Sequence, residues 1–266
     1  VVCVIHLALT LLEMVGKRTE DSGLVKCCCA NRKTMLPLLL IPALLVCFFL
    51  LMRAEGRAPR DVAAVRVWKP ACTILCILMC GLSLTQPGRD PLYTALIFIG
   101  LVFCLMGDVL LIPREDPKKF MYGLVSFLIG HIIFIAAFIA AQNTIGLPIN
   151  PAREVGAGLA LFVLAGVVFF YLRPGLGKMQ IPVMIYMAVI SLMVHRAVGG
   201  FYVGASVPLQ PLLAMAGALL FYVSDFVLAV DRFAFDGELP RANWMVLGTY
   251  FSAIALIALS TSFVRL

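Results

Sequence analysis

Two aspartates lie inside long apolar stretches of this sequence, where a carboxyl group is costly. Asp108 belongs to the stretch 91–112 and Asp225 to the stretch 209–230. A carboxylate near the middle of a bilayer costs about 2.5–3.5 kcal/mol on insertion scales, so such a residue usually has a function. The alternative for either residue is a carboxyl that pairs with a neighbouring helix or reaches the lipid headgroups.

Proton transfer is the chemistry that these carboxyls could perform together with His131. His131 lies near the middle of the apolar stretch 120–141, and the three groups suit either acid–base catalysis or a proton relay. The alternative is that His131 is a structural core residue whose ring nitrogens are hydrogen-bonded. No ligand spacing indicates a metal site, and the sequence has no zinc-protease, nucleophile-elbow or phosphate-loop motif. We therefore expect neither a metal nor a cofactor.

The elements that must position these residues are membrane-spanning helices. Of the 266 residues, 62% are hydrophobic and only 13% are charged, whereas about a quarter are charged in a soluble domain. Lipid offers no hydrogen-bond partners to the backbone, so a stretch that crosses about 30 Å of hydrocarbon must be a helix. Eight stretches are long enough: 35–52, 70–85, 91–112, 120–141, 156–172, 180–198, 209–230 and 243–264.

The sequence therefore predicts an all-α, polytopic transmembrane helical bundle of about eight spans over 35–266. An N-terminal extension, 1–34, precedes this domain, and its role is open. Its first residues are apolar and fit a signal-like segment, a further span or an untypical extension equally well.

Basic residues are distributed unequally between the loops. The formal net charge is +7, but the basic residues lie almost entirely outside the spans, so they indicate membrane topology rather than nucleic-acid binding. They are concentrated in the loops 53–69, 113–119, 173–179 and 231–242, and are rare in 86–90, 142–155 and 199–208. We expect the first set of loops to be cytosolic, with both ends of the eight-span domain on the other side.

The polar residues of the spans are predicted to gather in one half of the bilayer. Counting from the loops at about 1.5 Å per residue puts all these polar residues near the four loops that are rich in lysine and arginine. They are Lys69, Asp108, His131, Tyr186, Asp225, Asp231 and Tyr250. The alternative for Tyr186 and Tyr250 is that they belong to the belt of aromatic residues at the membrane interface. His195 and Arg196 lie near the opposite end of their span and are interpreted as an interfacial anchor.

The two aspartates share their local context. Each follows a small residue, Gly107 or Ser224, and a glycine precedes each by eight positions, at 100 and 217. Their spans are four apart and cross the membrane in the same direction. This pattern indicates a weak 4+4 parallel repeat, an arrangement in which functional groups lie between the halves.

These motifs together resemble the YhhN-like lysoplasmalogenase family of eight-span membrane proteins. The resemblance covers roughly 69–262 and depends on the order of the motifs. They are Lys69-Pro70, Gly107-Asp108, Gly123-Leu124, His131, Pro182, Tyr186, Gly217-Ala218, Ser224-Asp225 and Thr249-Tyr250. The chain departs from the family where a glutamine often follows the Thr-Tyr-Tyr motif, which puts one polar contact in doubt.

The resemblance implies hydrolysis of the vinyl ether bond of a lysoplasmalogen, giving a fatty aldehyde and glycerophospho-ethanolamine or -choline. Vinyl ethers are protonated at carbon, and water then attacks the oxocarbenium ion, which suits two carboxyls in unequal environments. The catalytic residues expected from this are Asp108, Asp225 and His131, without a choice between the two carboxyls. The expected substrate-binding residues are Lys69, Tyr186, Ser224, Asp231 and Tyr250, with Arg114, Lys118 or Lys119 on the phosphate.

Two other functions remain open. A proton-coupled transporter or a lipid-binding membrane protein could use the same Asp and His residues, although an alternating-access carrier should have polar residues leading to both faces. A hydrolase of other ether lipids or of epoxides would share the site. The expected partners are a lysophospholipid and membrane lipids, and the expected location is the endoplasmic reticulum in a eukaryote or the inner membrane in a bacterium. The sequence leaves the oligomeric state open.

Overall fold

Eight long helices make up the part of the protein that the structure describes. The computed structural model describes residues 36–86, 90–113, 116–145, 151–200 and 209–263, so the predicted extension 1–34 lies outside it. The elements are η1 (Leu36–Leu40), α3 (Ile41–Glu55), α4 (Val62–Leu84), α5 (Pro91–Leu110), α6 (Pro117–Ile145), α7 (Pro151–Leu176), η2 (Gly177–Met179), α8 (Gln180–Gly199), α9 (Leu209–Ala234) and α10 (Ala242–Ser260).

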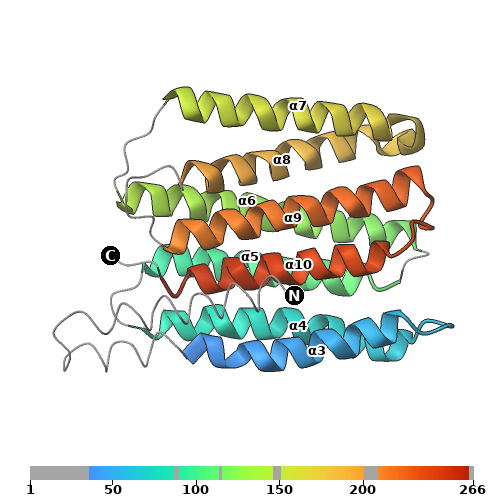
Figure 1. Cartoon of the computed structure of the whole chain (residues 1–266), viewed down its shortest axis with the longest axis horizontal. Helices are drawn as coiled ribbons and strands as arrows, with labels where there is room; N and C mark the ends of the chain where they lie inside the picture. The colour runs from blue at the N-terminus through green and yellow to red at the C-terminus, as the bar shows by residue number, and fades with distance from the viewer. Residues whose placement is uncertain (1–35, 87–89, 114–115, 146–150, 201–208, 264–266) are drawn as a thin grey trace.

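The helices are long and apolar enough to cross a membrane. Seven described stretches qualify, and the longest, Glu154–Gly199, contains two helices because η2 interrupts it. Gly177 in this turn has a φ of +49°, a left-handed conformation that favours glycine. α8 then runs back alongside α7 (Figure 1). The prediction of an all-α bundle of about eight spans is confirmed.

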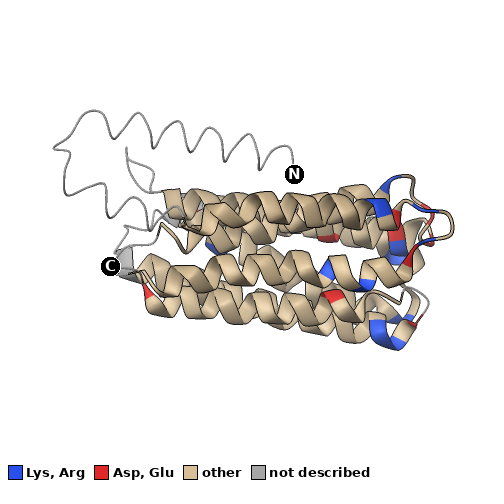
Figure 2. Ribbon diagram, turned by 90° about the horizontal axis from the view of Figure 1, so that it is seen from below, with Lys and Arg blue, Asp and Glu red and all other residues tan. Residues whose placement is uncertain are grey.

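Charged residues gather at one end of the bundle (Figure 2). This end holds the turns that follow α3, α5, α7 and α9 (Figure 1), which correspond to the four basic loops of the sequence. At the start of α4, for example, Asp61 accepts a hydrogen bond from the backbone N–H of Ala64, and this bond lowers the pKa of the Asp61 carboxyl. We call this end of the bundle the basic end.

The two halves of the bundle have the same pattern of neighbours. In the first half, α4 packs on α3 and α5, and α5 packs on α6. In the second half, α8 packs on α7 and α9, and α9 packs on α10. The halves also exchange contacts in the same way, because α4 lies against α10 and α8 lies against α6. This arrangement agrees with the predicted 4+4 repeat.

A glycine directly before Asp108 and another about two turns before Asp225 allow close helix packing. A Cβ atom on Gly107 of α5 would lie 2.5 Å from the ring of Phe127 on α6. A Cβ atom on Gly217 of α9 would lie 2.7 Å from the Ile257 side chain and 2.9 Å from the Ala253 carbonyl of α10. Both helix pairs therefore need a residue without a side chain at these positions.

α10 and α7 occupy opposite extremes of burial. α10 is the most buried of the described spans, because 67% of its most apolar 18-residue stretch is buried inside the bundle. It brings Tyr250 into the interior. α7 lies at the edge of the bundle (Figure 1), and large side chains such as Phe162 and Phe170 are exposed. In a membrane, exposed apolar side chains on a spanning helix face lipid.

Candidate active site

Asp108 on α5 forms a closed polar cluster with α4 and α10. Its Oδ2 accepts hydrogen bonds from the hydroxyls of Thr73, at 2.5 Å, and Tyr250, at 2.7 Å. Its Oδ1 lies 3.4 Å from Nζ of Lys69. The Asp108 side chain is only 1% exposed, so a cation and two hydroxyls satisfy a carboxylate that water does not reach. We call these four residues the Asp108 cluster.

Asp225 on α9 has a different environment. Its Oδ2 accepts a hydrogen bond of 2.5 Å from the hydroxyl of Tyr186 on α8, and lies 3.9 Å from Nε2 of His131 on α6. No lysine or arginine of the described residues lies within ion-pairing distance of it. Its side chain is 16% exposed, in contrast to that of Asp108. We call Asp225, Tyr186 and His131 the Asp225 cluster.

His131 is buried without a hydrogen-bond partner. The side chain is fully buried, and neither ring nitrogen has a hydrogen-bond partner among the described residues. Most buried polar groups in proteins are hydrogen-bonded, so an exception calls for an explanation such as a catalytic role. The ring packs edge-on against Tyr186 and Phe221, with centroids 5.5 and 4.6 Å away, which fixes the imidazole beside the Asp225 carboxyl.

Aromatic rings connect the two clusters. Phe221 on α9 packs against His131 on one side and against Tyr250 of the Asp108 cluster on the other, at a centroid distance of 5.4 Å. Phe127 on α6 contacts both Phe221 and Tyr250. A displacement of Tyr250 would therefore reach His131 through a single ring.

The two clusters occupy equivalent positions in the two halves. Lys69 and Asp108 lie 39 residues apart, and so do Tyr186 and Asp225. In each half the aspartate contacts the second helix of its own half, α4 or α8. Each also faces the last helix of the other half, through Tyr250 of α10 or His131 of α6. The repeat thus has one half-site with a lysine and one to which the described residues bring neither lysine nor arginine.

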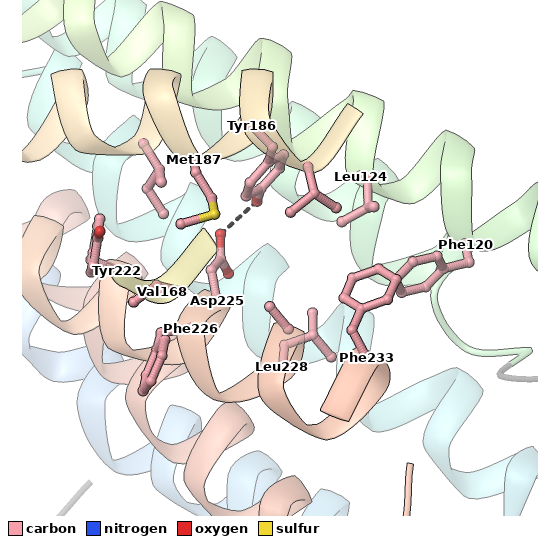
Figure 3. A pocket seen from close by; sticks show the side chains of 13 residues that line it. Phe120, Leu124, Val168, Tyr186, Met187, Tyr222, Asp225, Phe226, Leu228 and Phe233 are labelled. Atoms are coloured by element: carbon pink, nitrogen blue, oxygen red, sulfur yellow. Dashed lines mark hydrogen bonds between the residues drawn. The ribbon is translucent and has the colours of Figure 1, made fainter. Parts of the chain in front are cut away.

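The second half-site opens into a pocket lined by described residues (Figure 3). The pocket holds about 610 Å³ of empty space, its open mouth included, and lies between α6, α7, α8 and α9. Asp225 and Tyr186 are polar residues in a mostly apolar lining that includes Leu124, Val168 and Met187. Figure 3 shows the Tyr186–Asp225 hydrogen bond between residues of this lining. A small number of polar groups in an apolar pocket is typical of a small-molecule site.

The end of this pocket lined by Phe120 and Phe233 lies near the basic end, and we take it as the mouth. Phe120 at the start of α6 and Phe233 near the end of α9 line the pocket and pack edge-on, with ring centroids 6.4 Å apart. The guanidinium of Arg232 lies over the Phe120 ring, 5.0 Å from its centroid. Lys118 and Lys119 precede Phe120 and are exposed. Cationic side chains therefore lie near this end of the pocket, and the Asp225 carboxyl lies about two turns of α9 before Phe233.

The structure corrects the expected position of Lys69. The sequence predicted a span beginning at 70, with Lys69 at its mouth, but α4 begins at Val62. Lys69 is therefore about two turns inside the helix, 8% exposed, and bound to Asp108. A lysine in this position neutralises a carboxylate inside the bundle.

Ser224 and Asp231, whose binding of substrate stays a prediction, contact neighbouring parts of the chain. The Ser224 hydroxyl donates to the carbonyl of Val246, which ties α9 to α10. The Asp231 carboxylate accepts a hydrogen bond from the backbone N–H of Leu239 and closes the turn between these helices. Neither side chain belongs to the two clusters. Arg114 lies outside the described residues.

Sequence analysis missed Thr73 and the position of Arg232 at the pocket mouth. Thr73 lies one turn after Lys69 on α4, so its spacing from a residue already singled out was a usable signal. The cysteines of the same helix, Cys72, Cys76 and Cys80, are buried free thiols in the core. Among the described residues, no group of three His, Cys, Asp or Glu side chains could hold a metal ion.

Comparison with known proteins identifies the family. Residues 64–261 match the model of the YhhN family, which accounts for most of the chain. The chain belongs to the YhhN family. It is 34% identical to the lysoplasmalogenase TMEM86A of Bos taurus over 80% of this chain and 84% of that protein. It is 32% identical to the lysoplasmalogenase TMEM86B of Rattus norvegicus over 83% of this chain and 82% of that one.

The similarity to members of the YhhN family extends to bacteria. A lysoplasmalogenase of Mycobacterium bovis is 27% identical over 62% of this chain and 59% of that protein. No solved structure matches this chain significantly. The matched region, 64–261, includes every residue of both clusters. This YhhN family member is thus a multi-pass integral membrane protein whose polar clusters lie in the region shared with its relatives.

Proposed function

We propose that this protein is a membrane hydrolase that cleaves the vinyl ether bond of lysoplasmalogens. The products would be a fatty aldehyde and glycerophospho-ethanolamine or -choline. Relatives over four-fifths of the chain are lysoplasmalogenases. The observation that carries the proposal is Asp225, a carboxyl that Tyr186 orients within an apolar pocket whose mouth is cationic.

Asp225 is the residue that we assign to the protonation step. The proton of its carboxyl would move to the vinyl carbon farther from the ether oxygen, leaving an oxocarbenium ion. Water would then add to the carbon bonded to oxygen and lose a proton to the Asp225 carboxylate, giving a hemiacetal. The hemiacetal would transfer its hydroxyl proton to the glycerol oxygen as the C–O bond breaks, which releases aldehyde and alcohol. One water is consumed and Asp225 returns to its starting state.

His131 is suited to hold the attacking water. Its Nε2 lies 3.9 Å from the Asp225 carboxylate, a separation at which one water can bridge two polar groups. The imidazole has no protein hydrogen-bond partner among the described residues to compete with such a water. Packing against Tyr186 and Phe221 keeps the ring in place.

Asp108 is assigned a positioning role. It does not line the pocket, and Lys69, Thr73 and Tyr250 occupy its oxygens. Through Tyr250 and Phe221 the Asp108 cluster supports the ring of His131. Asp225 would thus transfer the protons, and Asp108 would help to position His131. The sequence instead led us to expect that both carboxyls act directly on the substrate.

The phosphate of the substrate is assigned to the mouth of the pocket. Arg232, Lys118 and Lys119 offer cationic groups there, and guanidinium groups match phosphate geometry well. A single-chain lipid fits a site with cations at the entrance and an apolar interior. We place the protein in the endoplasmic reticulum of a eukaryotic cell or the inner membrane of a bacterial one.

The activity can be tested with three matched lipids. The purified protein in phosphatidylcholine vesicles would be given lysophosphatidylethanolamines with a vinyl ether, a saturated ether or an ester chain. We expect aldehyde from the vinyl ether alone. Absence of aldehyde from an inserted, folded protein would refute the function. Proton flux across the same vesicles, driven by a pH gradient, would instead support the transporter alternative.

A further inference from the structure

A long groove on the lipid-facing side of the bundle lies next to the pocket that contains Asp225. It lies between α7 and α8 and holds about 1090 Å³ of empty space, its open side included. Its walls are formed mainly by apolar and small residues, among them Leu161, Ala165 and Gly166 of α7 and Ala188 of α8. Met187 lines both this groove and the pocket that contains Asp225, so its side chain lies between the two spaces.

The groove runs away from the basic end. α8 begins at Gln180 at that end, and Tyr186 binds Asp225 between one and two turns further on. From Met187 the groove continues along α8 to His195, which is about 12 Å at the rise of an α-helix. One leaflet of a bilayer contributes about 15 Å of hydrocarbon, so the groove is comparable in length with a lipid chain.

Polar residues close the far end of the groove. Nε2 of His195 lies 3.4 Å from the Glu154 carboxylate, and Arg196 lies 3.6 Å from the same carboxylate. The residue pair that the sequence analysis interpreted as an interfacial anchor is thus bound to the start of α7. An apolar chain that enters from the Asp225 side would meet apolar walls up to this point and charged groups beyond it.

We propose that the α7–α8 groove binds the hydrocarbon chain of the substrate beyond the bond that is cleaved. This inference rests on the proposed function and adds the site that selects chain length. Since lipid tails are as apolar as the groove, burial there gives the chain little free energy. The groove acts by shape instead. It guides one extended chain past Met187, so that the vinyl ether remains beside Asp225.

Gly166 and Ala188 allow the groove to be filled without disturbing the bundle. A Cβ atom on Gly166 meets nothing within 4 Å, so Gly166→Leu adds volume to open space. Ala188→Leu narrows the groove from the opposite wall. Gly156 is the matched control, because it lies on the same helix, is also open to a Cβ atom, and is not part of the groove lining.

The test compares two chain lengths in each variant. Octadecenyl and butenyl lysophosphatidylethanolamines with the same vinyl ether would be assayed for aldehyde release by the wild-type protein and the three leucine variants, because the butenyl chain ends near Met187. The added side chains take up space that the long chain needs and displace its vinyl ether from Asp225, so kcat/KM for the long chain should fall roughly tenfold or more in both groove variants. The short chain should be cleaved within about twofold of the wild-type rate, and Gly156→Leu should match the wild type on both.

Each other outcome has a definite meaning. If the groove variants kept wild-type activity on both lipids, bulk membrane lipid and not substrate would fill the groove, and the inference would be overturned. An equal loss on both lipids in the groove variants would also overturn it, because chain length would then be irrelevant. A wild-type protein that releases no aldehyde from either lipid would instead refute the proposed function itself.

Discussion

Replacement of Asp225 by asparagine separates its proposed chemistry from its structural role. Asparagine keeps an oxygen that can accept the hydrogen bond from Tyr186, which Asp225 now accepts at 2.5 Å. The protonated carboxyl of the proposed mechanism and the amide are both neutral and close in shape, and asparagine enters lipid more readily than a carboxylate. The Asp225→Asn protein should therefore fold and insert. It cannot donate a proton to carbon, so its rate should fall by about 10²–10⁴-fold, or roughly 3–5 kcal/mol in the barrier.

The assay measures aldehyde release from a vinyl ether lysolipid by purified protein in vesicles. Tyr186→Phe is the matched control, because it removes the hydrogen-bond donor and leaves the carboxyl. Its loss should be smaller than that of Asp225→Asn, since the acid remains and only its orientation suffers. If carbon protonation limits turnover, the wild type should also be slower in deuterium oxide. An inserted Asp225→Asn protein with an aldehyde rate within tenfold of wild type would refute the assignment.

The remaining predictions concern the other cluster, the histidine and the topology. Asp108→Asn should destabilise the protein by about 3–5 kcal/mol, because Lys69 would be left buried without its partner, and the double variant with Lys69→Met should recover much of this in thermal unfolding. An Asp108→Asn variant that unfolds at the same temperature as the wild type would contradict the ion pair. His131→Phe should fill the same space and reduce aldehyde release less than Asp225→Asn does, and an unchanged rate would exclude His131 from water binding. Cysteines introduced at 116 and 237 should react with an impermeant reagent from one side of the membrane and a cysteine at 147 from the other, and a split between 116 and 237 would show that the number of spans is wrong.

The sequence by itself determined the class of fold and the inventory of unusual residues. Spans are recognised by their length and apolarity, which are local properties of the chain. The excess of lysine and arginine in alternate loops was enough to predict which turns lie together at one end. Asp108, Asp225 and His131 were recognisable because a polar group in lipid is costly wherever the helices pack.

Tertiary structure decided which of these residues meet and which carboxyl can reach a substrate. Helix boundaries were one reason, since α4 begins several residues earlier than its most apolar part, which places Lys69 inside the bundle. The rotation and tilt of each helix were the other, because they depend on packing between helices far apart in the chain. The two aspartates have nearly the same local sequence, yet Lys69 satisfies Asp108 in a closed cluster while Asp225 faces a pocket. That difference arises from what the neighbouring helices bring to each carboxyl, and no span carries this information alone.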